Sequence, residues 1–473
     1  MAHLRTLVVA GWVVVAGSVA AAPTVVADRG AANVGAVDAI GTTARDDATA
    51  QLQALIDGTP DGGVVQLERD ANYRVEGTLV VEERHDLRID GNGARIFATT
   101  TAEGRRRHLQ INGGANLTVS DLEIHGANPH AGLDDRGYVP ELEGQHGISL
   151  EGVTNVELNR VHIHDTYGDH VYVSRHPRDR GRWSDRIWIH DSTFKRSGRQ
   201  GIAVVAARDV VIERNTFADM RRATIDLEPN GQGWGAENIH ILDNHVGRGR
   251  LLFVAAGGGG PVNQVVIARN ELQGRPMNLW VIPPEDERRQ RFWVVDNTSD
   301  TAAAKPPLRF TRADGVVVDG NRQPIRGPGE PLVLATDSCD VSVTDNDTAP
   351  GTLALGGESR RCNSSGLPME PPEPPSVTGA GQPSATPPTA AQPPTTAADP
   401  SNTASATTAT TEAATSTSRG STPTTEPRGA QLAGSDTRGA DGVAVPVIVL
   451  AAVLTALAGV GGVLVFSARR GRQ

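Results

Sequence analysis

Short segments that alternate apolar and polar residues recur along the middle of the chain, and each of them ends on Asn or Asp. These segments are Leu117–Asp121, Val156–Asn159, Ile187–Asp191, Val210–Asn215, Ile239–Asn244, Val265–Asn270, Trp293–Asn297, Val316–Asn321 and Val341–Asn346. After the first interval, their closing residues lie roughly 24 to 32 positions apart, a spacing typical of stacked repeat proteins. Short strands joined by turns of variable length predict an all-β parallel solenoid, in which each coil pairs with the next. The closing Asn suits a corner with left-handed backbone geometry, so we interpret these residues as scaffold.

A second short apolar strand precedes the Asn-ended one in most coils. Its triplets are Ile148–Leu150, Val171–Val173, Ile202–Val204, Ile225–Leu227, Leu252–Val254, Leu279–Val281 and Leu308–Phe310. Because side chains alternate across a strand, the outer residues of each triplet face the core and the central ones face solvent. The predicted outward line is Ser149, Tyr172, Ala203, Asp226, Phe253, Trp280 and Arg309. His170 and Glu228, two positions away from Tyr172 and Asp226, are expected on the same face.

The predicted outward face mixes aromatic rings with carboxylates. Tyr172, Phe253 and Trp280 would offer apolar faces on which sugar rings stack, and nearby acids would accept hydrogen bonds from hydroxyl groups. An alternative is that Phe253 and Trp280 lie under long turns and form a small separate core. The sequence leaves both interpretations open.

The turns before this strand are rich in basic residues. They carry Lys195, Arg196, Arg199, Arg221, Arg222, Arg248, Arg250 and Arg275. Stacked coil on coil, they predict a basic ridge that attracts an anionic polysaccharide, although single surface arginines are usually just solvated. The net charge of −10 argues against nucleic acid as a partner. Long inserts, one of which begins at Arg175, are expected to wall the groove at 126–145, 175–185, 229–237 and 283–291.

Asp226 and Glu228 are the strongest catalytic candidates. At i and i+2 on one face, their carboxyl groups would lie roughly 6 to 7 Å apart, near the separation in inverting glycosidases. Ca²⁺ binding by the same oxygens is an equal alternative. A polysaccharide lyase would instead use Lys195 or Arg199 to neutralise a uronate or remove its proton, with His170 or Tyr172 as base or donor. Arg199, Arg222, Arg250, Phe253, Trp280 and Arg175 are the candidate substrate-binding residues.

The segment before the repeats is similar to that of a known superfamily. The strings Asn33–Asp38, Arg45–Ile56, Gly62–Gln66, Tyr73–Val75 and Leu87–Gly93 follow one another in an order that resembles the pectate-lyase-like superfamily of right-handed parallel β-helix proteins. The resemblance covers roughly residues 33 to 360 and implies a helix that caps the stack, with a cap at 28–85 and a β-helix domain at 86–363. It leaves the reaction open, because the superfamily includes lyases, hydrolases, epimerases and non-enzymes. His146 is similar to the His of a polygalacturonase motif whose companion strings are absent, and His162, His164 and His190 are expected to be ordinary surface or stacking residues.

The two ends of the chain predict export and anchoring. Residues 1–27 are typical of a secretory signal, and the Pro-, Thr-, Ser- and Ala-rich residues 364–441 predict a disordered stalk. Residues 442–468 form an apolar run long enough to span a bilayer, and the arginines in 469–473 predict a cytoplasmic tail. The β-helix domain would then be extracellular.

Cys339 and Cys362 are the only cysteines, and in an exported chain they predict a disulfide at the open end of the stack. Three hypotheses about function remain, and the weakest is a structural cell-wall spacer without a site. The first is a surface-anchored lyase or glycoside hydrolase that acts on an acidic polysaccharide. The alternative is a non-catalytic glycan-binding or adhesive surface protein that uses the same groove.

Overall fold

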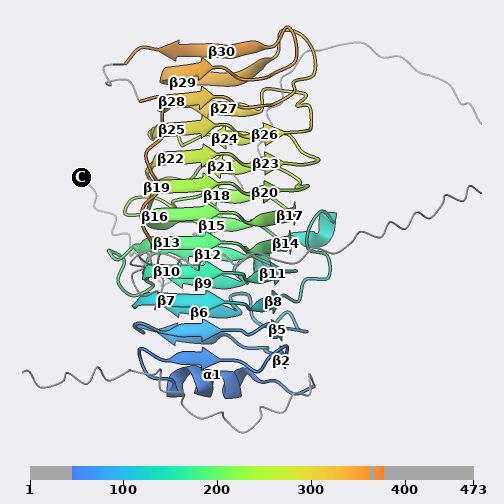
Figure 1. Cartoon of the computed structure of the whole chain (residues 1–473), viewed down its shortest axis with the longest axis vertical. Coiled ribbons are helices and arrows are strands. Elements are labelled where there is room, and N and C mark those ends of the chain that lie inside the picture. The colour runs from blue at the N-terminus through green and yellow to red at the C-terminus, as the bar shows by residue number, and fades with distance from the viewer. Residues whose placement is uncertain (1–44, 363–367, 378–473) are drawn as a thin grey trace, which may run out of the picture. The chain divides into compact units, whose positions relative to one another are not determined.

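The computed structural model describes residues 45–362 and 368–377. Within them, every named strand pairs in parallel with its equivalent in the next coil, which confirms the predicted all-β parallel solenoid (Figure 1). Each coil contributes one strand to each of three faces. Apolar residues that point inward from all three faces form one continuous core along the stack.

The three faces are defined by their strands. The first face contains β3 (Leu79–Glu82), β6 (Leu109–Asn112), β9 (Ile148–Glu151), β12 (Val171–Ser174), β15 (Ile202–Val204), β18 (Ile225–Leu227), β21 (Val254–Ala256), β24 (Leu279–Val281) and β27 (Leu308–Thr311). The second face contains β1 (Val64–Gln66), β4 (Arg88–Asp90), β7 (Ala115–Ser120), β10 (Thr154–Asn159), β13 (Ser184–His190), β16 (Ala206–Glu213), β19 (Gly235–Leu242), β22 (Val262–Ala268), β25 (Arg289–Val295) and β28 (Ala313–Asp319). The third face contains β2 (Asn72–Arg74), β5 (Arg95–Phe97), β8 (Glu123–His125), β11 (His162–His164), β14 (Thr193–Ser197), β17 (Thr216–Met220), β20 (His245–Val246), β23 (Glu271–Leu272) and β26 (Thr298–Ser299). The long strand β29 (Pro331–Thr344) continues both the first and second faces, and β30 (Leu353–Arg360) pairs with it.

A ladder of buried Asn residues marks the corner between the second and third faces. Its members are Asn215, Asn244, Asn270, Asn297, Asn321 and Asn346. The backbone N–H of each donates to the side-chain oxygen of the next at 2.9–3.0 Å. These hydrogen bonds confirm that the Asn residues act as scaffold. The left-handed backbone geometry that we expected at each Asn is, however, found one residue earlier. It belongs to the preceding residue, such as Arg214 (φ 51°) or Asp243 (φ 52°), whose turn swings the Asn into the stack.

Both ends of the stack are closed as expected. The helix α1 (Thr49–Gly58) buries Leu52 and Ile56 on the first coils. The stack begins earlier than residue 86, however, because β1 already pairs with β4 and β3 with β6. At the other end, the predicted disulfide joins Cys339 to Cys362.

An extended segment, residues 368–377, lies along the outer side of the second face (Figure 1). There the indole Nε1 of Trp293 donates to the carbonyl of Pro368 at 2.9 Å. An outward apolar stripe on this face is almost fully buried, and it consists of Val211, Leu242, Val266, Ala268, Trp293 and Val317. The segment was expected to belong to a free stalk, and we refer to it as the strap.

The rest of the predicted ends lies outside the described residues. This applies to the signal at 1–27, the remainder of 364–441, the apolar run at 442–468 and the tail at 469–473. Of the helices that the structure describes, none combines the length and apolar character needed to cross a membrane.

Candidate functional site

The first face brings Tyr172, Ala203 and Asp226 into one line, as predicted. Their strands β12, β15 and β18 pair in register, and Ser149 on β9 precedes Tyr172 in the same line. Asp226 is only 8% exposed, so it lies at the floor of this face. Glu228 follows β18 directly and is more exposed than Asp226.

Two predicted members of the outward line, Phe253 and His170, are instead buried in the core. The register of β21 places Ala255, rather than Phe253, beside Asp226. Both Phe253 and His170 directly precede a first-face strand, at the corner where the chain turns into it. Strand alternation does not extend to this corner, and both side chains are 0% exposed. The placement of Phe253 and His170 on the groove was therefore wrong.

The surroundings of His170 confirm a structural position. Its ring stacks on Phe194 at a centroid distance of 6.0 Å, and its Nδ1 lies 3.2 Å from the hydroxyl of Thr166. Burial lowers the pKa of His170 to about 3, so the ring is neutral at ordinary pH. Because the ring is buried in the core, it cannot reach a substrate and does not suit the base of a lyase.

Lys195 also lies away from Asp226. It is an exposed residue of β14 on the third face, in register with His164 and Ala218. Its neighbour Arg196 pairs with Asp165 on the same side of the stack. The turn that was expected to carry Lys195 starts two residues later, because β14 extends to Ser197.

Arg199 is the centre of the charged cluster on the first face. Its guanidinium lies 3.0 Å from Asp169, 2.7 Å from Glu228 and 3.6 Å from Glu143. Burial lowers the pKa of Arg199, but Asp169 and Glu228 outweigh burial and hold it well above its usual value. Arg199 was predicted to bind substrate, whereas here its guanidinium is engaged by three protein carboxyl groups.

Asp226 has the surroundings of a protonated acid. Burial and the nearby charge of Glu228 raise its pKa well above the usual value, although Arg199 opposes this. The side-chain amide of Gln200 donates to Asp226 Oδ2. The orientation of that amide is fixed, because its oxygen accepts the backbone N–H of Ala223 at 2.7 Å. Asp226 and Glu228 are therefore adjacent carboxyl groups in different environments.

Asp169 is the main residue that the sequence reasoning missed, and His146 was named there without a role in this site. Asp169 is fully buried between Arg199 and His146, and its Oδ1 accepts the backbone N–H of Gln200 at 3.0 Å. Burial is the largest cause that raises its pKa. The Nδ1 of His146 accepts the backbone N–H of Asp169 at 3.1 Å, which fixes its tautomer. The sequence signal that could have identified Asp169 is its position, an acid in the turn one coil before Arg199.

Tyr172 lies over this buried pair. Its ring stacks on His146 with a centroid distance of 4.6 Å and an interplanar angle of 3°. Burial lowers the pKa of His146 well below its usual value and raises the pKa of Tyr172. Both rings are therefore neutral, and Tyr172 presents an aromatic surface beside the acids.

The predicted basic ridge is largely covered by the insert at 126–147. This insert contains two short 3-10 helices, η1 (Asp135–Gly137) and η2 (Pro140–Leu142). Arg222 lies over the ring of Tyr138 at 4.7 Å, and Arg250 forms an ion pair with Asp135. Arg275 is 3% exposed and donates to Thr224 at 3.1 Å. An open ridge of free positive charge was therefore not the correct interpretation.

The opposite wall forms where two predicted inserts meet. The guanidinium of Arg175 stacks over the ring of Trp234 at 3.7 Å, and the indole N–H of Trp183 donates to the carbonyl of Gly233 at 3.0 Å. These contacts join the inserts after β12 and β18 across the short intervening coil. Val205 in that coil is 1% exposed as a result.

Trp280 lies on the outward line as predicted, in register with Ala255 and Arg309. The guanidinium of Arg309 lies 4.9 Å from the centre of its ring. The guanidinium of Arg309 therefore packs against one face of the indole.

The described residues contain groups of three close metal ligands, and none of these groups includes Asp226 or Glu228. Arg199 Nη2 lies 2.7 Å from Glu228 Oε2. Its positive charge therefore already pairs with the carboxylate that a Ca²⁺ ion would need as a ligand. This arrangement fits an internal ion pair better than a Ca²⁺ site.

Comparison with known proteins identifies similar chains. Residues 63–278 match the family model described as right handed beta helix region. Uncharacterized protein YclG of Bacillus subtilis (strain 168) is 25% identical over 209 residues, which cover 40% of this chain and 34% of that protein. Alpha-1,3-galactosidase A of Bacteroides fragilis (strain YCH46) is 25% identical over 171 residues, which cover 35% of this chain and 26% of that protein. The chain thus spans about a third or less of the length of these curated relatives.

A solved structure with a similar chain path is PfbA, a surface adhesin of Streptococcus pneumoniae. It aligns with 66% of this chain and 88% of its own, at 13% identity and a TM-score of 0.44.

Proposed function

We propose a function for the first face from the premise that this chain belongs to the right-handed parallel β-helix proteins. The first face binds a polysaccharide and hydrolyses a glycosidic bond in it. The observation that carries the proposal is the pair Asp226 and Glu228, adjacent carboxyl groups in contrasting environments. One relative, an alpha-1,3-galactosidase, has a carbohydrate as its substrate.

Inverting hydrolysis needs one protonated carboxyl group and one carboxylate. The acid protonates the leaving oxygen, and the carboxylate activates a water on the other side of the sugar ring. Asp226 fits the acid, because burial and Glu228 raise its pKa. Glu228 fits the carboxylate, because Arg199 pairs with it at 2.7 Å. A buried, protonated acid beside a carboxylate that pairs with an arginine is an arrangement typical of acid–base pairs in enzymes.

The surrounding side chains suit a sugar polymer. Tyr172 supplies a neutral aromatic surface beside the acids, and Trp280 supplies a second one further along the same line. The insert at 126–147 and the joined inserts with Arg175 and Trp234 bound the face on its two edges. A rigid floor with polar walls can position a long chain relative to Asp226.

The charge of the substrate follows from the same contacts. Arg199, Arg222 and Arg250 contact Asp169, Tyr138 and Asp135. The same face also carries Glu151, which pairs with Arg107 at 3.4 Å, and Glu228, which pairs with Arg199. We therefore propose a neutral polysaccharide in place of the acidic one that the sequence favoured. A lyase keeps only Arg199 and Tyr172 of its predicted residues, because His170 is buried and Lys195 lies on the third face. Arg199 is already paired with Asp169 and Glu228, which leaves it less suited to bind a uronate.

The test is to incubate the protein with a panel of neutral and acidic polysaccharides and to measure reducing ends and unsaturated uronate. We expect reducing ends from a neutral polymer, and a loss of about 100-fold or more in Asp226→Asn and Glu228→Gln. Asp243→Asn is the matched control, because its acid pairs with Arg269 away from the groove. Equal activity in Asp226→Asn and the control would contradict the proposal.

The binding alternative is favoured by one observation, the tight engagement of Glu228 with Arg199. The guanidinium of Arg199 already occupies one oxygen of this carboxylate, which leaves Glu228 less free to position a catalytic water. If the wild type binds a glycan but releases no product across the panel, the first face is a recognition surface. Affinity electrophoresis on the same polymers distinguishes this outcome from a lack of any carbohydrate ligand.

A further inference from the structure

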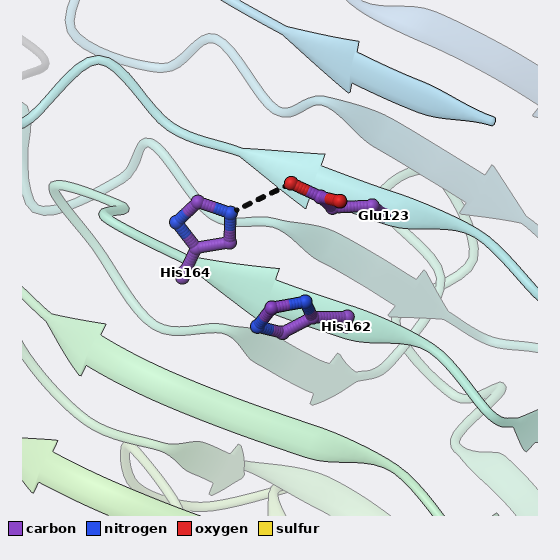
Figure 2. A group of neighbouring side chains, drawn as sticks. All are labelled: Glu123, His162 and His164. Atoms are coloured by element: carbon purple, nitrogen blue, oxygen red, sulfur yellow. Dashed lines mark hydrogen bonds and ion pairs between the residues drawn. The ribbon is translucent and has the colours of Figure 1, made fainter. Parts of the chain in front are cut away.

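A compact group of histidines and carboxylates lies on the third face, away from the proposed groove. Glu123 on β8 pairs in register with His162 on β11, and His125 pairs with His164. Residues two apart on a strand share a face, and paired residues of neighbouring strands lie about 4.8 Å apart. The four side chains therefore form a square patch, three corners of which Figure 2 shows.

Three members of this patch present ligand atoms to one another. The Nε2 of His164 lies 3.0 Å from Glu123 Oε1. The rings of His162 and His164 have centroids 4.9 Å apart. One ligand atom from each of Glu123, His162 and His164 falls within 4.8 Å of the other two.

His162 has a buried ring nitrogen that the fold does not satisfy. Its Nε2 is inaccessible and has no hydrogen-bond partner among the described residues. Buried polar atoms normally have partners, so an unpaired one next to two potential metal ligands points to a bound ion.

His164 is oriented by a second carboxylate. Its Nδ1 lies 2.7 Å from Asp165 Oδ2, and a carboxylate can only accept, so this nitrogen carries a proton. The other nitrogen, Nε2, donates to Glu123 in the metal-free protein, so a metal ion that binds here must displace the Nε2 proton. A carboxylate behind a histidine ligand is the usual way in which proteins fix the ligand tautomer at a metal site.

We propose that Glu123, His162 and His164 bind a divalent transition-metal ion, for which Zn²⁺ is the reference probe. Two imidazole nitrogens and one carboxylate oxygen are a common ligand set for such ions. Ligand atoms around tetrahedral Zn²⁺ lie about 3.4 Å apart, so the present spacing requires only side-chain adjustment. The site goes beyond the proposed hydrolysis and is independent of it.

Arg95 is the protein cation that now occupies the position next to Glu123. Its Nε lies 2.9 Å from Glu123 Oε1. An incoming metal ion must compete with this guanidinium for the carboxylate. Replacing Arg95 by Met therefore removes the competitor and leaves all three ligands in place.

The experiment is equilibrium dialysis of the full chain, without an affinity tag, against Zn²⁺. We expect saturable binding that weakens at least tenfold in Glu123→Gln and in His162→Gln, and that strengthens in Arg95→Met. His245→Gln is the matched control, because His245 is also on the third face, pairs with Glu271 at 3.5 Å and belongs to none of the three-ligand groups found among the described residues. Thermal unfolding in EDTA checks that all variants fold equally well.

A spectroscopic measurement gives an independent readout. With Cu²⁺ as the probe, electron paramagnetic resonance should show coupling to two imidazole nitrogens in the wild type and to one in His162→Gln. Zn²⁺ binding that is equal in the wild type, Glu123→Gln and His162→Gln would overturn the proposal, as would a Cu²⁺ signal without nitrogen coupling.

Discussion

The guanidinium of Arg199 and the carboxylate of Glu228 form an ion pair at 2.7 Å, from positions in successive coils of the stack. Arg199 also reaches Asp169, which is fully buried. The pair therefore connects a surface acid of the groove to a carboxylate inside the protein.

We predict that Arg199→Met destabilises the protein strongly. Removing one partner leaves Asp169 and Glu228 without their shared counter-ion, a change that typically costs about 3–5 kcal/mol. The free energy of unfolding from urea titration measures it. Arg269→Met is the control, since its pair with Asp243 is exposed and such pairs contribute about 1 kcal/mol or less. Similar losses in both variants would show that the Arg199 cluster is not special.

Asp226→Asn should stabilise the protein at pH 7 while it removes activity. The folded pKa of Asp226 is raised, so its contribution to stability is full below the unfolded pKa of about 3.9 and is lost as the pH rises. Asn has no charge to bury and can still accept from Gln200. We expect a gain of about 1 kcal/mol at pH 7 that vanishes below about pH 4. Thermal melts at both pH values test this, and a loss of stability at pH 7 would contradict it.

Glu76 should have the opposite pH dependence. Burial raises its pKa, but hydrogen bonds from the hydroxyl and backbone groups of Thr100 and Thr99 outweigh burial and lower the pKa to about 2. Its stabilising contribution is therefore present above about pH 4.5 and is lost as the pH falls through about 2. Glu76→Gln should cost about 2–3 kcal/mol at pH 7 and little at pH 2. Glu271→Gln, at an exposed acid, should change stability by less than about 0.5 kcal/mol at either pH.

The Asn ladder should be most sensitive to substitution in its middle. Asn270 donates to the carbonyl of Ile241 and to Asn297 at 2.8 Å, and it accepts the backbone N–H of Asn244. Asn270→Ala leaves these buried groups unpaired and should cost about 3 kcal/mol. Asn346→Ala, at the more exposed end of the ladder, should cost about 1 kcal/mol. Denaturant titration of the two variants compares the positions.

The sequence could predict the fold because the solenoid repeats a local pattern. Each Asn-ended strand marks the same corner, so the spacing of Asn215, Asn244 and Asn270 indicates the coil length directly. The disulfide followed from the presence of only two cysteines. These inferences need no knowledge of contacts between distant coils.

The site was harder to predict because it depends on corners and on contacts between turns. Strand alternation gave Tyr172 and Asp226 correctly, but it failed for His170 and Phe253, which lie just before their strands begin. The roles of Arg199 and Asp169 depend on which turns stack on one another. The order of residues places an acid in the turn one coil before Arg199, but it does not show that the two side chains meet.

The strap gives the stack a property that simple solenoids lack. When coils contact only their neighbours, unfolding can begin at one end and proceed coil by coil. Ten extended residues span about 30 Å, which corresponds to about six coil spacings, and Figure 1 shows the strap running past several second-face strands. Fraying of the last coils would therefore have to detach the strap from strands far below, which couples distant coils into one cooperative unit.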